Sequence, residues 1–141
     1  MKYHFRAHIR DGECWAECIE LEGCLTQGKD FDDLKRNAYD SLNLYLDEPQ
    51  DSKLLFSLPR KVLGSHKDIF EVDVEPQIAF SLLLRQTRIS KGLTQKAMAK
   101  QLGIENLYSY QRLEKRANPT LATVNRIKEA VPEFQCEYVF N

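Results

Sequence analysis

The chain has 141 residues and a net charge of -1, with 43% hydrophobic and 29% charged residues. This length provides for one ordinary domain or two small ones, and it excludes a barrel or a doubly wound enzyme with a separate substrate domain. The composition excludes disordered, collagen-like and disulfide-scaffold classes. No stretch approaches the roughly 18 apolar residues of a membrane span, so we expect a cytoplasmic protein with no membrane partner.

The near-neutral net charge of the chain is the sum of an acidic half and a basic half. Residues 1–75 hold 10 basic and 16 acidic residues, whereas residues 76–141 hold 10 and 5, which gives net charges of -6 and +5. We therefore predict an α+β protein with two domains, 1–75 and 76–141, in which 49–68 is a poorly placed connecting segment. The basic domain is the candidate for binding a polyanion, and a solvated charge gradient without a partner is the alternative.

The first predicted element is a β-hairpin over residues 3–19. Asp11-Gly12 is a favoured two-residue turn, and alternating sequences flank it on both sides. Pairing across the turn places Arg10 opposite Glu13 and continues to Phe5 opposite Cys18. One face of the hairpin then carries small apolar side chains, namely Phe5, Ala7, Ile9, Cys14, Ala16 and Cys18.

The cysteines do not have the paired spacing of a structural zinc site, and in a reducing compartment we expect all four as free thiols. These are Cys14, Cys18, Cys24 and Cys136. The hairpin register points the first two into the apolar face and points His4 and His8 away from it. We therefore predict no metal site and no other cofactor.

The chain continues with a short strand over 24–27 and a helix capped by Asp30 and stopped near Pro49. The apolar run 54–56 is a candidate short strand. Residues 69–75 alternate as a half-buried strand with an acidic outer face. Apolar residues recur at helical spacing along this helix, at Phe31, Leu34, Ala38, Leu42 and Tyr45.

Residues 3–46 resemble the HicB antitoxin family. The resemblance rests on the hairpin, on Leu21-Glu22-Gly23-Cys24-Leu25-Thr26-Gln27-Gly28, and on the helix with Asp32-Asp33 and Asn37-Ala38. Family members usually carry prolines where this chain has Ile19 and Glu22, so the loop before Gly23 is expected to follow a different path. The resemblance implies a HicB-like partial RNase H sheet with a helix, which binds a toxin and has no working nuclease site.

The basic half has a helical period. We predict a helix from Pro76 to about Lys91, a second over 95–102 after the N-cap Thr94, a third from Asn106 to about Glu114, and a fourth from Asn118-Pro119 to Val131. The fourth helix has an apolar stripe that begins with Leu121. Alternation over 134–140 predicts a terminal β-strand, which either pairs with its symmetry mate or packs on its own domain.

Four short helices with a tight turn at Gly103 indicate a helix-turn-helix domain. The sequence resembles the phage-repressor-like Cro/CI (XRE) class at Gly92-Leu93-Thr94-Gln95, Ala99, Leu102-Gly103-Ile104, Glu114 and Asn118-Pro119-Thr120-Leu121. Between Gly103 and Glu114 there is one residue more than the class pattern, and between Glu114 and Pro119 one fewer. If the extra residue precedes Asn106, the recognition face begins at Leu107; if it lies later, the face shifts by one.

The residue types on this face suit DNA. Arg112 can contact guanine or phosphate, Gln111 adenine or phosphate, and Tyr108 the thymine methyl group. Arg85, Lys100 and Lys115 are expected to add sequence-independent attraction. The candidate DNA-binding residues are Gln95, Lys96, Leu107, Tyr108, Ser109, Gln111, Arg112 and Arg116. The alternative is a helix-turn-helix domain that packs on protein.

The two resemblances together imply an antitoxin of a type II, HicAB-like toxin-antitoxin system. Such a protein neutralises a HicA-like mRNA interferase toxin and represses its own operon by binding operator DNA, as a homodimer or a higher even oligomer. The alternative is a helix-turn-helix transcriptional regulator whose N-terminal domain senses a ligand or a protein. We expect no enzyme and no catalytic residues, because the sequence has no Ser/His/Asp or Cys/His arrangement and no glycine-rich phosphate loop.

Overall fold

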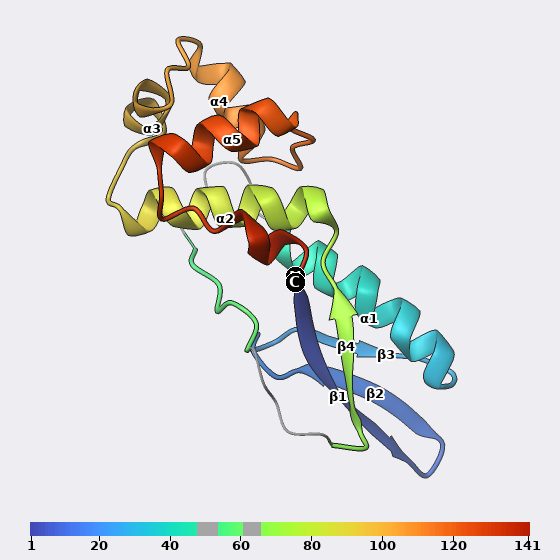
Figure 1. Ribbon diagram of the computed structural model, residues 1–141. Coiled ribbons are helices and arrows are strands. Elements are labelled where there is room, and N and C mark those ends of the chain that lie inside the picture. Colours follow the sequence, from blue (N-terminus) through green and yellow to red (C-terminus); the bar gives the residue numbers. More distant parts are fainter. Residues whose placement is uncertain (48–53, 61–65) are drawn as a thin grey trace. The chain divides into compact units, whose positions relative to one another are not determined.

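The computed structural model describes residues 1–47, 54–60 and 66–141. In these residues the fold is α+β, with one four-stranded antiparallel sheet and five α-helices (Figure 1). The chain divides into two compact units. Unit 1 comprises Met1–Leu46 and Phe56–Val74, and unit 2 comprises Asp47–Leu55 and Glu75–Asn141. No helix in the described ranges is long and apolar enough to cross a membrane.

The hairpin of β1 (Lys2–Arg10) and β2 (Glu13–Cys18) has the predicted register, from Arg10 opposite Glu13 to Phe5 opposite Cys18. Asp11 and Gly12 have φ angles of 50° and 82°. Positive φ at both turn positions is what a two-residue turn between twisted strands requires, and Asp-Gly adopts it at low cost. The turn therefore fixes the register, as the sequence predicts.

Two further strands complete the sheet of unit 1. β3 (Leu25–Gln27) pairs with β2, and β4 (Ile69–Asp73) pairs with the other edge of β1, which gives the order β3-β2-β1-β4. Both strands were predicted. The prediction of a strand in the apolar run at residues 54–56 was wrong, because this run pairs with no strand of the described sheet; Phe56 packs on the ring of Tyr45, with centroids 5.4 Å apart. Pro49 lies outside the described residues.

Helix α1 (Phe31–Leu46) covers one face of the sheet, and the core of unit 1 lies between them (Figure 1). The Asp30 carboxylate accepts a hydrogen bond from the Asp33 N–H at 2.8 Å, as expected of an N-cap. Near the hairpin turn the expected apolar face is not covered, and Ile9 is 63% exposed. Buried core residues include Tyr3, Phe5, Ala16, Cys18, Leu34, Ala38, Leu42 and Leu46.

Unit 2 contains α2 (Pro76–Ser90), α3 (Gln95–Gln101), α4 (Leu107–Leu113) and α5 (Leu121–Ala130). The first three agree with the predicted helices, and α2 is central because its residues 78–86 are all buried. The predicted start of the last helix was wrong. Thr120 is its N-cap, two residues after Asn118, and the expected core residue Leu121 is 88% exposed on the first turn.

The predicted terminal strand over 134–140 was also wrong. Residues Cys136–Val139 form a 3-10 turn instead. Phe134 is fully buried and packs edge-on against Phe80 of α2, with ring centroids 5.5 Å apart, whereas Phe140 is 77% exposed. A strand needs a neighbouring strand for its backbone hydrogen bonds, and the described part of unit 2 offers only helices.

Candidate nucleic-acid interface

Helices α3 and α4 are joined by a sharply defined turn over residues 102–106. Gly103 has a φ of 70°, its N–H bonds to the Lys100 carbonyl at 3.1 Å, and the Ile104 N–H bonds to the Ala99 carbonyl at 2.8 Å. These two bonds form a Schellman motif, which requires a residue that tolerates positive φ. Asn106 then caps α4 by accepting from the Tyr108 N–H at 2.9 Å. Both ends of the turn are therefore fixed by local sequence.

The rotation of α4 about its axis is set by one buried aromatic residue. Tyr110 is fully buried, whereas Tyr108 is 65% exposed and Gln111 lies at the half-buried edge. Because side chains repeat every 3.6 residues, burying position 110 turns the opposite face outward. The exposed residues of that face are Tyr108, Ser109 and Arg112, and Leu107 is exposed on the first turn of the helix.

Two grooves with cationic side chains border α4, one along the helix and the turn that follows it and one between α3 and the start of α4. One, of about 710 Å³, includes Tyr108, Arg112 and Lys115 in its lining, and the Arg112 guanidinium carbon lies 5.9 Å from the centre of the Tyr108 ring. The other, of about 840 Å³, includes Lys96 and Lys100. Aromatic and guanidinium groups flanked by lysines can contact base edges and phosphates together.

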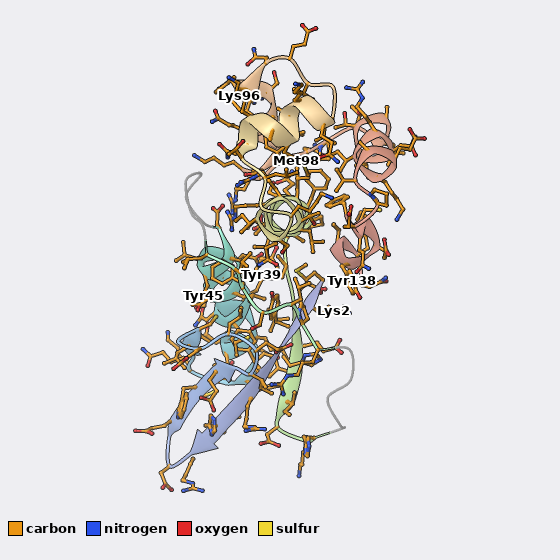
Figure 2. All side chains as sticks on the ribbon, turned by 90° about the vertical axis from the view of Figure 1, so that its left-hand side faces the viewer. Lys2, Tyr39, Tyr45, Lys96, Met98 and Tyr138 are labelled. Carbon is orange, nitrogen blue, oxygen red and sulfur yellow. The ribbon has the colours of Figure 1, made fainter. Side chains whose placement is uncertain are left out.

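Helix α3 presents its N-terminal part to the same region. Figure 2 labels Lys96 and Met98 on this helix, where Lys96 is exposed and Met98 is fully buried. Gln95 is tied to neighbouring side chains. Its Oε1 accepts from Gln111 Nε2 at 3.1 Å, and its Nε2 donates to Glu114 Oε2 at 3.0 Å. Gln95 and Gln111, which were both predicted to contact DNA, therefore form a hydrogen-bonded pair that joins α3 to α4.

A buried carboxylate holds this pair in place. Glu114 is 2% exposed and accepts hydrogen bonds from Arg88 Nε at 2.6 Å and from the Tyr110 hydroxyl at 2.5 Å, in addition to Gln95. Burial and the adjacent carboxylate raise the pKa of Tyr110. Burial acts to lower the pKa of Arg88, but the hydrogen bonds and charges of Glu114 and Tyr110 together outweigh burial and raise that pKa. The network positions the exposed face of α4.

Two arginines lie differently from the sequence prediction. Arg85 is 2% exposed, so its expected attraction to phosphate was wrong. Arg116 has a φ of 46° and pairs with Asp47 at 3.2 Å and with Glu75 at 3.5 Å. These carboxylates compete with any phosphate for the Arg116 guanidinium. Lys115 remains exposed beside it.

The sequence reasoning used Glu114 only as a marker of resemblance and missed its role as an anchor. The available signal was its spacing of four from the inward-facing Tyr110, which places both side chains on one face of the helix. Arg88, 26 residues earlier, gives no local signal. Contacts of this separation in sequence are decided by tertiary packing.

Among the residues described, no group of three or more His, Cys, Asp or Glu side chains is arranged to hold a metal ion. Compared with known proteins, the chain matches no family model and no curated protein.

Proposed function

We propose that the chain is a HicB-type antitoxin of a type II, HicAB-like toxin-antitoxin system. In this proposal unit 2 is a Cro/CI-type helix-turn-helix domain that binds operator DNA in its own promoter, and unit 1 binds a HicA-like mRNA interferase. The observation that carries the proposal is the exposed face of α4, presented outward by the buried Tyr110 and flanked by two cationic grooves. The sequence resemblances of residues 3–46 and 92–121 support it.

On DNA, α4 acts as the recognition helix in the major groove. Arg112 pairs with guanine, Tyr108 packs on a thymine methyl group, and Lys96 contacts phosphate. A single helix of this size makes few base contacts. A homodimer places two such helices about one DNA turn, roughly 34 Å, apart and so reads a palindromic operator.

The acidity of the first half supports the toxin-binding role. Residues 1–75 carry a net charge of -6, and exposed carboxylates lie on both α1 and β4, among them Asp32, Asp40 and Glu71. A toxin that binds RNA is electropositive, so an acidic surface speeds its encounter and competes with RNA for the same face.

One feature of unit 1 favours the second candidate, a transcriptional regulator that senses a small ligand. A groove of about 850 Å³ is lined in part by His8, Trp15 and Phe31, and the rings of His8 and Trp15 stack at 4.1 Å. Lys67 and Asp68 add charged groups to the same lining. Aromatic walls with a few polar groups suit a planar organic molecule.

Expression of a short, basic reading frame next to the gene separates the two candidates. An antitoxin predicts growth arrest by that reading frame, relief when this chain is produced with it, and co-purification of the two proteins. A harmless neighbour, or one that never co-purifies, removes the toxin-antitoxin proposal and leaves the regulator.

Gel-shift titration with the upstream DNA tests unit 2 separately. Arg112→Ala is expected to cost about 1–3 kcal/mol of discrimination between operator and random DNA. Lys96→Ala is expected to weaken binding to both DNAs equally and to reduce the salt slope by about 1. The control is Arg126→Ala, an exposed arginine on α5. Equal effects of the two arginine substitutions would show that α4 does not read bases.

A further inference from the structure

Two cysteines of unit 1, Cys18 at the end of β2 and Cys24 just before β3, lie opposite each other where the ladder of these two strands ends. The β2–β3 register pairs Glu17 with Leu25, and the next opposed pair is Cys18 and Cys24, whose backbones are joined by a Cys18 N–H to Cys24 carbonyl bond of 2.9 Å. Opposed residues in such a ladder have Cα atoms about 4.5–5.5 Å apart. That spacing lies within the roughly 4.4–6.8 Å that a disulfide spans.

Both thiols of this pair are buried. Cys18 is 6% exposed and Cys24 is 2% exposed, and the Cys18 thiol lies 4.0 Å from a Glu20 carboxylate oxygen. The interaction with the neighbouring Cys24 thiol, together with burial, raises the pKa of Cys18. The interaction with Cys18 lowers the pKa of Cys24 against the opposing effect of burial. The thiolate is the reactive form of cysteine, so Cys24 is the better nucleophile and Cys18 stands beside it as a resolving thiol.

The connection between the two cysteines gives a route for a reagent. Residues 19–23 form a tight loop in which Glu22 and Gly23 are exposed, and Gly23 has a φ of 81°. Local opening of a surface turn requires far less free energy than global unfolding. We expect such an opening, which breaks the bond from the Tyr45 hydroxyl to the Glu22 carbonyl, to uncover Cys24 while the hairpin of β1 and β2 stays paired.

We propose that Cys18 and Cys24 are a redox modification site that forms an intramolecular disulfide with a low-molecular-weight disulfide such as glutathione disulfide. The Cys24 thiolate attacks one sulfur of the reagent, which breaks the reagent's S–S bond and releases one thiol. The Cys18 thiolate then attacks the Cys24 sulfur of the mixed disulfide and releases the second thiol. The protein loses two electrons and two protons, and the reagent gains them as two thiols.

The product joins the ends of the loop over residues 19–23. This loop also contains Glu20, whose buried carboxylate accepts hydrogen bonds from the backbone N–H groups of His4 and Arg60 at 3.0 and 3.1 Å. The disulfide therefore restrains the segment that ties Arg60 to β1 within unit 1. We expect the unfolding temperature of unit 1 to rise by several degrees on oxidation.

The other two cysteines provide internal controls. Cys14 and Cys136 are more exposed than the pair, and Cys14 stands opposite Ile9 on β1. A reagent that reaches them leaves a mixed disulfide, because no resolving thiol stands across the strand from Cys14 and Cys136 lies in unit 2. The two classes of product differ in mass, so they are distinguishable in one sample.

The test uses the full-length Cys14→Ser/Cys136→Ser variant, incubated with glutathione disulfide under native conditions and followed by intact mass. The expected product has lost two hydrogen atoms and carries no glutathione. Cleavage after glutamate then separates Cys18 from Cys24 unless they are cross-linked, since Glu20 and Glu22 lie between them. The expected finding is one linked pair of peptides that a thiol reductant separates.

Cys24→Ala in the same background is the matched control, and it is expected to give a stable mixed disulfide at Cys18 or no reaction. The wild-type chain provides a check that needs no substitution, because cleavage after Glu17 places Cys14 on a peptide of its own. A folded protein that accumulates glutathione on Cys24 without a Cys18–Cys24 link would overturn the proposal. So would a link that forms only in denaturant.

Discussion

In each unit a buried carboxylate holds several segments together, but the groups that compensate its negative charge differ between the two units. Glu114 in unit 2 faces the guanidinium of Arg88 at 2.6 Å. Glu20 in unit 1, with a side chain 1% exposed, lies 2.9 Å from His4 Nδ1 and accepts from the backbone N–H groups of His4 and Arg60 and, at 4.0 Å, from the Cys18 thiol. Unit 2 thus pairs its buried charge with a permanent cation, whereas unit 1 relies on a histidine and peptide dipoles.

The comparison shows what a buried carboxylate contributes in each setting. Removing one member of a buried ion pair leaves the other charge uncompensated, which costs more than losing hydrogen bonds to neutral donors. The single Trp of the chain, Trp15, lies in unit 1, so its fluorescence follows that unit. Of the five α-helices in the described residues four lie in unit 2, so far-ultraviolet circular dichroism follows mainly that unit.

The largest effect is expected for Glu114→Gln. The substitution leaves the Arg88 guanidinium without its counter-ion and disrupts the Gln95 and Tyr110 bonds, so unit 2 is expected to lose about 3–5 kcal/mol of unfolding free energy. Urea denaturation followed by circular dichroism measures it. Glu105→Gln, an exposed site on the turn before α4, is the control. A loss no larger than that of the control would refute the anchoring role of Glu114.

A smaller loss is expected for Glu20→Gln. The amide nitrogen that replaces one carboxylate oxygen then faces the N–H of His4 or Arg60, so one hydrogen bond to this buried side chain is lost, at a cost of about 1–3 kcal/mol in unit 1. The measurement is the urea transition of Trp15 fluorescence, with exposed Glu22→Gln as the control. If Glu20→Gln proved as costly as Glu114→Gln, the proposed difference between neutral and cationic partners would be wrong.

The smallest effect concerns the start of α1 in unit 1. Asp33 accepts a hydrogen bond from the Lys29 N–H at 2.9 Å and also contacts Arg36, and these contacts lower its pKa from the usual 3.8. A lowered folded-state pKa stabilises the fold above the ordinary pKa, and this stabilisation is lost as pH falls through the folded value. Asp33→Asn should therefore lower the unfolding temperature near neutral pH.

Its deficit relative to wild type should shrink as the solution is acidified below pH 3.8, the ordinary value for this carboxyl group. Asp32→Asn, on the same first turn and exposed, is the matched control across the same pH series. A deficit that stays constant from neutral to acid pH would show that the ionised carboxylate of Asp33 contributes nothing to unit 1.

Local signals in the sequence predicted most of the elements. The hairpin register follows from Asp11-Gly12, and the helix starts follow from Asp30, Thr94 and Asn106, because a turn or cap is decided by a few neighbouring residues. Local signals gave the wrong start for the fourth helix, because Asn118-Pro119 and Thr120 are both acceptable start signals. The hydrogen bond of Thr120 to the Thr123 N–H selects the later start.

The two differently charged halves and the strand pairing of the hairpin followed from the sequence alone, whereas the outward face of α4 remained open by one residue until the burial of Tyr110 set it. Tertiary structure alone decided that Arg85 is buried, that Arg116 pairs with Asp47, and that the tail after Phe134 is not a strand. The difference lies in the sequence separation over which each kind of signal acts. Alternation and capping report on neighbours along the chain, whereas burial, ion pairing and strand formation depend on groups brought together from distant positions.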